Sequence, residues 1–246
     1  MTHRPDGYTF RHFESIDSTN EEARRLAASG EQGPVWITAG QQTAGRGRRG
    51  RSWASPPGNL AATLFLRPDR PASSCAQLSF VAALAVSDIV SRQAHSSDVR
   101  VKWPNDVLAD DRKIAGILLE SAGSGGERLD WLAVGIGINL AHFPPDTEFP
   151  ATSLAELGAP VPLPADAAGH LAGAWSRWYE VWRSDGFGQI RDVWLSRAAR
   201  LGARIRARLA SEETSGVFEG IDLDGALILR ERPGQTRAIA AGEVFF

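Results

Sequence analysis

The stretch VRVKWPNDVLADDRKIAGILLE, residues 99–120, carries the signals that decide the fold. Its first five residues alternate apolar and basic side chains, which predicts a strand, and Pro104 ends that strand because proline cannot donate to a sheet ladder. Asp110 and Asp111 then lie at a turn between two apolar runs, the pattern of a β-hairpin. LDWLAVGIGIN, residues 129–139, predicts a further, nearly continuous buried strand.

Helical signals lie on both sides of this region. In the segment 17–30, DSTNEEARRLAASG, Ser18 and Thr19 each precede a glutamate by three residues, the capping-box spacing of a helix start. Residues 76–90 and 164–183 repeat apolar side chains at helical spacing, and a shorter helix follows the second of them. VWITA (35–39) and NLAATLFLR (59–67) predict strands. We therefore predict an α+β fold with a mixed sheet and packed helices.

The predicted secondary structure changes near residue 200 from helices to short strands and turns. ARIRARLA, GVFEGI, ALILRE and TRAIA predict short strands, and the clusters DLDG and RPGQ between them are typical of turns. We predict a large domain over residues 1–199 and a small, barrel-like β domain over residues 200–246.

Composition restricts the class of protein. The 246-residue chain has a formal net charge of -2, and its 43% hydrophobic and 23% charged residues are typical of globular proteins. The single cysteine, Cys75, excludes an internal disulfide and lies in a predicted helix, which favours core packing over a nucleophile. The five histidines show no zinc-binding spacing. Runs such as NLAATLFL are too short to span a bilayer and no signal peptide is evident, so we expect a cytoplasmic protein.

The loop QQTAGRGRRGR, residues 41–51, concentrates four arginines and three glycines in its last seven positions. A nucleic-acid patch, a phosphate clamp for a small molecule and a solvated loop are all open. The remaining chain cancels the charge of the loop, which argues against nucleic acid. A Walker loop is absent, and GIGIN (135–139) lacks the third glycine of a dinucleotide fingerprint, so its glycines can equally permit close strand packing.

The end of the predicted strand at Pro104 presents polar side chains where ligands commonly bind, namely those of Lys102, Asn105 and Asp106. Asn105 can equally cap the turn. Lys113 lies in an otherwise apolar run, where its desolvation favours a role opposite an anion.

Five motifs in this order, DSTN, QTAGRGRRGRSW, KWPNDV, DRKIAGILLE and GIGIN, closely resemble those of the biotin protein ligases, also called biotin–[acetyl-CoA-carboxylase] ligases or holocarboxylase synthetases. The resemblance extends from about residue 12 to the C-terminus. It implies a catalytic domain similar to class II aminoacyl-tRNA synthetases, followed by an SH3-like β-barrel. It also implies that ATP and Mg2+ convert the substrate biotin into biotinyl-5'-AMP, and that biotin then passes to one lysine of a biotin carboxyl carrier domain.

The resemblance assigns roles by motif position. The implied biotin contacts are Ser18, Thr19, Asn20, Gln42, Arg46, Gly47, Arg48, Lys113 and Gly116. The implied ATP and adenylate contacts are Arg51, Trp53, Lys102, Asn105, Asp106, Lys113, Gly135, Gly137 and Asn139. The implied catalytic residues are Lys113, which bridges the biotin carboxylate and the α-phosphate, Arg48 of the closing loop, and Asp106, which either holds magnesium or accepts the proton of the incoming lysine.

The resemblance also sets expectations about partners. Barely a dozen residues precede FESIDSTN (13–20), so we expect the ligase-only form without the DNA-binding helix-turn-helix of some relatives, and neither DNA nor a membrane as a partner. The oligomeric state is open between a monomer and a homodimer. A lipoate protein ligase, whose catalytic domain shares this architecture, and a nucleic-acid-binding protein that uses the arginine loop are the alternatives.

Overall fold

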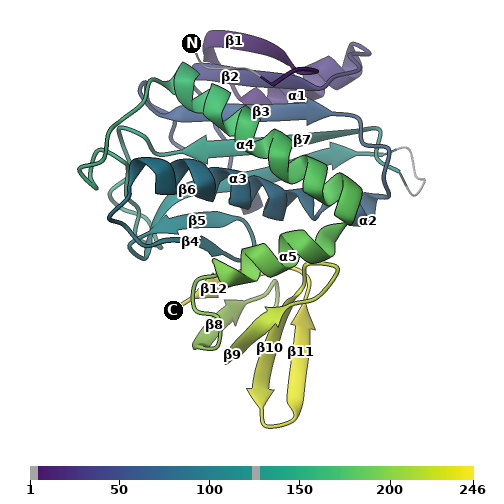
Figure 1. Ribbon diagram of the computed structural model, residues 1–246, viewed down its shortest axis with the longest axis vertical. Helices are drawn as coiled ribbons and strands as arrows, with labels where there is room; N and C mark the ends of the chain where they lie inside the picture. The colour runs from purple at the N-terminus through teal and green to yellow at the C-terminus, as the bar shows by residue number, and fades with distance from the viewer. Residues whose placement is uncertain (1–4, 124–127) are drawn as a thin grey trace.

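The computed structural model describes residues 5–123 and 128–246 and contains two sheets (Figure 1). The larger sheet has seven strands in the order β1-β2-β3-β7-β6-β5-β4. Strand β1 pairs in parallel with β2, and the other neighbours are antiparallel, so the predicted mixed sheet is confirmed. The strands are β1 (Thr9–Ile16), β2 (Val35–Gln42), β3 (Leu60–Leu66), β4 (Val99–Lys102), β5 (Asp106–Ala109), β6 (Arg112–Ala122) and β7 (Trp131–Ile138).

Helices cover both faces of this sheet. Helices α3 and α4 cross one face, and α1 packs on the other (Figure 1). Strand β2 shows why: Trp36 belongs to the core beneath α3 and α4, whereas Val35 and Ile37 pack with residues of α1. Successive side chains of a strand point to opposite faces, so both faces are apolar. The helices are α1 (Thr19–Ala28), α2 (Ala72–Cys75), α3 (Leu78–Gln93), α4 (Pro164–Asp185), α5 (Phe187–Ser196) and the 3-10 turn η1 (Arg48–Gly50).

The helix start and the hairpin that short sequence motifs predicted are both present in the structure. The Ser18 side chain accepts a hydrogen bond from the backbone N–H of Glu21 at 3.5 Å, which confirms the N-cap of α1. Asp110 and Asp111 have φ values of 51° and 58° between β5 and β6, a conformation that aspartate tolerates in a tight hairpin turn. Strand β1 was not predicted, because its exposed edge position leaves only a weak apolar pattern.

The segment 72–93 is an exception to the expectation that the apolar runs are too short to span a bilayer. It has 22 residues, and its most apolar 18-residue window has a mean hydropathy of 1.5, so by length and composition alone it is apolar enough to cross a bilayer. In the fold, however, 67% of its most apolar window is buried inside the protein, where α3 packs against α4 and the sheet. Cys75 at its start is 1% exposed, which confirms the packing role. The apolar character of this segment is therefore that of a core helix.

The smaller sheet has five antiparallel strands in the order β11-β10-β9-β8-β12, consistent with the SH3-like fold that the sequence predicted. Its core contains Ile205, Phe218 and Leu229. The division at residues 199 and 200 stays a prediction. The strands are β8 (Arg204–Arg208), β9 (Glu213–Ile221), β10 (Leu227–Arg232), β11 (Gln235–Ile239) and β12 (Glu243–Phe245).

Specific hydrogen bonds hold the smaller sheet against the larger one. The buried indole of Trp103 donates to the carbonyl oxygen of Gly225 at 3.0 Å, and the Gln77 amide donates to that of Leu223 at 3.1 Å. The segment that connects α5 to the smaller sheet also covers β4, the edge strand of the larger sheet, because Ala199 N–H donates to the carbonyl oxygen of Val101 at 2.8 Å. As a result, β12 lies beside the polar end of the larger sheet.

Candidate active site

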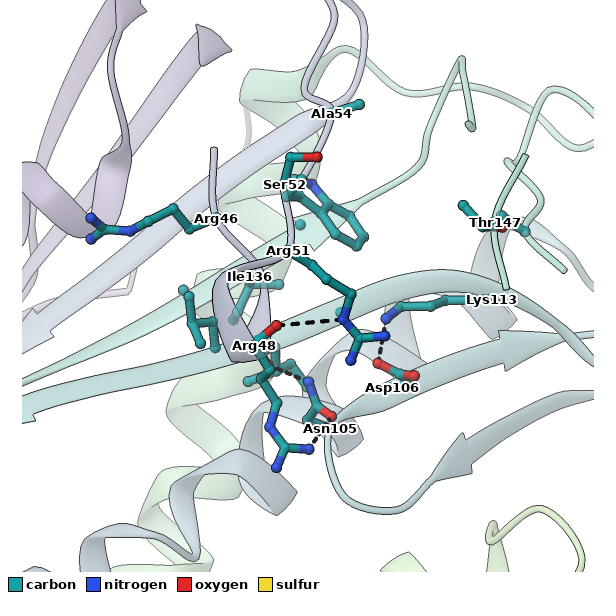
Figure 2. A pocket seen from close by; sticks show the side chains of 18 of the residues that line it. Arg46, Arg48, Arg51, Ser52, Ala54, Asn105, Asp106, Lys113, Ile136 and Thr147 are labelled. Atoms are coloured by element: carbon teal, nitrogen blue, oxygen red, sulfur yellow. Dashed lines mark hydrogen bonds and ion pairs between the residues drawn. The ribbon is translucent and has the colours of Figure 1, made fainter. Parts of the chain in front are cut away.

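A cavity of about 390 Å³ lies between the arginine loop, the strands β3, β5, β6 and β7, and the end of β12 (Figure 2). This volume is in the range of sites that bind small molecules. Every site residue that the motifs predicted lines this one cavity. These residues are Ser18, Thr19, Asn20, Gln42, Arg46, Gly47, Arg48, Arg51, Trp53, Lys102, Asn105, Asp106, Lys113, Gly116, Gly135, Gly137 and Asn139.

One end of the cavity is a network of hydroxyl and amide groups at the start of α1. Gln42 Oε1 accepts hydrogen bonds from the backbone N–H of Thr19 at 2.9 Å and from its hydroxyl at 3.0 Å. Thr63 Oγ1 lies 2.8 Å from Thr19 Oγ1 and 2.6 Å from Asn20 Oδ1. Both Thr19 and Asn20 are buried, so these groups are held in fixed orientations and present donors and acceptors toward one ligand end.

Arg46 lies at the same end of the cavity and pairs with two carboxylates. Its guanidinium lies 3.3 Å from a Glu21 oxygen and 3.2 Å from a Glu120 oxygen. Glu120 also accepts a hydrogen bond from Asn20 Nδ2 at 2.7 Å. The arginine loop is thereby tied to α1 and β6.

The centre of the cavity holds a buried carboxylate between two ammonium groups. Asp106 is 8% exposed, and Lys113 Nζ lies 2.6 Å from one of its oxygens (Figure 2). Lys102 Nζ lies 3.5 Å from the other oxygen. Burial opposes the ionisation of Asp106, but the two ammonium groups outweigh it and lower its pKa. Burial also lowers the pKa of Lys102, although Asp106 opposes that shift. With a net charge of +1, the trio is suited to an anionic ligand.

The remainder of the loop is held by the C-terminal strand. Arg48 donates to Asn105 Oδ1 at 3.1 Å and to the carbonyl oxygen of Gly242 at 3.3 Å. Glu243 forms an ion pair with Arg51 and lies 3.6 Å from Arg49. The β12 strand therefore positions the cations of the loop over the cavity.

Glycines of neighbouring strands form the floor. Gly116 of β6 pairs with Gly137 of β7, and the Trp53 indole rests on both. A Cβ atom on Gly137 would lie 2.4 Å from this indole, and one on Gly135 would lie 2.3 Å from Asn20 Oδ1. The glycines of the GIGIN motif thus allow the Trp53 indole and the Asn20 amide to lie directly on the sheet.

The donor set does not favour a metal ion bound directly by the protein. Within residues 5–123 and 128–246, no three histidine, cysteine, aspartate or glutamate side chains group closely enough to hold one. Asp106 already faces two cations, which would repel a third.

Sequence reasoning did not identify several residues that shape the cavity. Thr63 and Glu120 lie on predicted strands, but only the pairing of β3, β7 and β6 brings them beside Asn20. Phe149 places its ring 4.2 Å from Lys102 Nζ, and Glu243 arrives from the far end of the chain. For Glu243 the only signal in the sequence was its position as a carboxylate in an otherwise apolar C-terminal segment, and this pattern is too common to be specific.

Comparison with known proteins agrees with this geometry. Residues 12–139 match the Biotin/lipoate A/B protein ligase family, and residues 201–246 match the Biotin protein ligase C terminal domain. The chain is 49% identical to the biotin--[acetyl-CoA-carboxylase] ligase of Paracoccus denitrificans, over 94% of this chain and 97% of that protein. It is 32% identical to the bifunctional ligase/repressor BirA of Escherichia coli, over 93% of this chain and 71% of that protein.

A solved structure shares the whole arrangement. The biotin protein ligase from Aquifex aeolicus in complex with biotin and ATP superimposes with a TM-score of 0.82 at 26% identity and covers 96% of this chain and 97% of its own. The ordered motifs, the single cavity they line and the two matched segments lead to one conclusion: the chain belongs to the biotin protein ligase family.

Proposed function

We propose that the protein is an ATP-dependent biotin protein ligase that forms biotinyl-5'-AMP with release of pyrophosphate and transfers biotin to a lysine of a carboxylase carrier domain. The observation that carries this conclusion is the convergence of all five motifs on one cavity with polar groups at one end and cations at the other. A nucleic-acid partner fits less well, because the arginine loop is directed into the cavity and paired with carboxylates. A lipoate ligase is disfavoured by the C-terminal match and by the biotin ligase relatives.

The polar end of the cavity is the proposed site of the biotin head. A cyclic urea has one acceptor and two donors, which suit the hydroxyl and amide groups of Ser18, Thr19, Asn20 and Gln42. Because these groups are already held by hydrogen bonds to one another and to Thr63, little ordering is needed when the ligand binds. Arg46 and Gly47 would then close over the bicyclic ring and its chain, and Gly116 would lie beneath them in the floor of the cavity.

The cationic end is the proposed site of activation. Attack of the biotin carboxylate on the α-phosphate brings two anions together, so fixed positive charge lowers the barrier. Lys113 is the proposed bridge between them, with Arg48 and Arg51 as further donors to phosphate. Trp53, Lys102, Asn105, Gly135, Gly137 and Asn139 are proposed to surround the adenylate.

Asp106 is proposed to position Lys113 and Lys102. Its pKa is lowered by the two ammonium groups, so it is a weak acceptor for the proton of the incoming carrier lysine. That lysine has an ordinary pKa of about 10.4 and must lose a proton before it attacks the acyl carbon. A role for Asp106 in orientation fits its ion pairs better than a role as general base or as a metal ligand.

Mg2+, the usual ion of ATP-using ligases, would neutralise charge on the phosphates of ATP. Since the protein offers no cluster of acids among its described residues, we infer that the ion is bound mainly by the nucleotide.

Residues 1–199 would supply most of the chemistry, and residues 200–246 would position the loop through Glu243. The cytoplasm is the proposed location, and the segment 72–93, which by length and composition could cross a bilayer, is mostly buried inside the protein.

Intact-mass spectrometry of a purified biotin carrier domain tests this function. The carrier is incubated with the protein, biotin, ATP and magnesium, and parallel samples omit ATP or replace biotin by lipoate. One biotinyl group per carrier is expected, only with ATP and biotin, and Lys113→Ala should slow its formation about 10²- to 10³-fold. Labelling with lipoate in preference to biotin, or no labelling and no biotin-dependent pyrophosphate exchange, would contradict the proposal.

A further inference from the structure

The basic residues of this chain are distributed unusually. Of its 27 lysines and arginines, 25 are arginine, and the two lysines are Lys102 and Lys113. Lysine is ordinarily one of the commonest residues. Both lysines line the cavity, and both contact Asp106, at 3.5 and 2.6 Å. A preference for arginine as a residue type accounts for the low lysine count, but it does not place both lysines on one buried carboxylate.

The chemistry of the proposed intermediate gives this distribution a meaning, and the inference rests on the proposed function. In an acyl adenylate, the lone pair of a neutral amine attacks the acyl carbon, the bond from that carbon to the phosphate oxygen breaks, and AMP leaves with the electron pair. The amine nitrogen then releases a proton to solvent, and a stable amide remains. At pH 7 roughly one lysine amine in a few thousand is neutral, whereas an arginine guanidinium stays protonated.

The two lysines that remain are both paired with the Asp106 carboxylate. Lys102 is 6% exposed, and its ammonium lies against the Phe149 ring at 4.2 Å and close to Asp106. Burial lowers the pKa of Lys102, which favours the neutral amine, so its protection depends on enclosure by these neighbours. The Lys113 side chain is 26% exposed and is held by Asp106 at 2.6 Å.

We propose that the chain protects itself from its own intermediate by presenting arginine at the exposed positions around the cavity. The loop over the cavity illustrates this, since its four cations are all arginines: Arg46, Arg49 and Arg51 are exposed, and Arg48 is half-buried. Arginine provides the same charge toward phosphate and carboxylate without a nucleophilic amine. The activated biotin therefore meets its first accessible side-chain amine on the carrier, which favours transfer to the carrier over self-modification.

Thr147 offers a position for the test. It is exposed, lines the cavity, and lies on the loop opposite Arg51 and Lys113 (Figure 2). Thr147→Lys introduces an amine at the rim, and Thr147→Arg introduces the same charge without a nucleophile. Arg92→Lys, at the exposed end of α3 and outside the cavity, introduces an amine at a distance.

Wild type and variants are incubated without a carrier, either with biotin, ATP and magnesium or with synthetic biotinyl-5'-AMP alone, and labelled positions are mapped by peptide mass spectrometry. The α-amino group, with an ordinary pKa of about 8, reports the reaction of a free amine. With ATP we expect Thr147→Lys to be labelled at residue 147 at least about tenfold faster than Arg92→Lys at residue 92, because proximity raises the effective concentration. Thr147→Arg should match wild type.

Labelling of Lys102 or Lys113 in wild type as fast as the α-amino group would overturn the inference. Equal labelling of Thr147→Lys and Thr147→Arg would also overturn it. If the ATP samples give no label while synthetic adenylate labels residue 147 of Thr147→Lys, the ligase function fails and the self-protection argument stands.

Discussion

Replacement of Asp106 by asparagine separates the stability of the charged trio from its chemistry. The substitution keeps the size of the side chain but leaves two ammonium groups near one uncharged amide, and Lys102 among them is 6% exposed. Removal of one partner from a buried ion pair costs about 3–5 kcal/mol. Because the Lys113 side chain is 26% exposed and can turn toward solvent, we expect the lower end, about 3 kcal/mol.

Lys113→Ala is the matched comparison. It leaves Asp106 paired with Lys102 at 3.5 Å, a neutral pair, so the free energy of unfolding should change by less than about 1 kcal/mol. Adenylation should fall about 10²- to 10³-fold, the usual effect of removing one group that stabilises developing charge. The double variant Asp106→Asn/Lys113→Ala should be more stable than Asp106→Asn alone, because one uncompensated charge is gone.

Thermal unfolding and biotin-dependent pyrophosphate exchange measure the two effects. For a domain of this size about 1 kcal/mol corresponds to 2–4 °C, so Asp106→Asn should lower Tm by about 6–12 °C and Lys113→Ala by less than about 4 °C. The reasoning is refuted if Lys113→Ala is as unstable as Asp106→Asn, or if the double variant is less stable than both single variants.

Three further predictions follow from the site and from α1. Glu243→Gln should raise the KM for ATP about 3- to 10-fold by releasing the loop arginines, whereas Glu213→Gln, whose arginine partners lie on β8, should leave it unchanged; steady-state pyrophosphate exchange checks both. Gly137→Ala places a methyl 2.4 Å from an indole and should reduce adenylation at least about tenfold, whereas Gly173→Ala, with nothing within 4 Å, should not; equal activities would contradict this. A hydrogen bond from an arginine lowers the pKa of Asp17 from 3.8 to about 2, so its stabilisation is present above about pH 4 and is lost as the pH falls through about 2. Urea denaturation of Asp17→Asn should show a loss below about 1 kcal/mol at pH 7, since the side chain is 44% exposed, and a much smaller loss at pH 2, where Asp17 is partly protonated in the folded protein.

Features encoded by neighbouring residues were predictable from the sequence. The cap at Ser18 and the turn at Asp110 and Asp111 depend on a few side chains and on the local backbone, and both formed where expected. The apolar face of residues 164–183, which form α4, was also predictable, and Trp175 on this helix packs edge-on against Trp36 with ring centroids 6.3 Å apart. Local patterns therefore determined most elements and the cavity residues that lie within motifs.

Features that depend on tertiary contact were not predictable. The edge strand β1 has a weak apolar pattern, because it is stabilised by pairing with β2 and is exposed along much of its length. Glu243 is near Arg51 only because Trp103 and Gln77 fix the smaller sheet against the larger one. No spacing within a single sequence reports a contact between residues almost two hundred positions apart.

The cavity wall is completed by the two ends of the chain. Ser18 and Phe245 both line it, and the connection between the two sheets passes through an exposed turn in which Arg200 and Gly202 have φ values of 62° and 78°. A chain divided in this turn yields two fragments, and neither carries the whole site. Ligase activity would then report the association of the fragments, which makes the turn a suitable position for a split-enzyme sensor of proximity between two fused proteins.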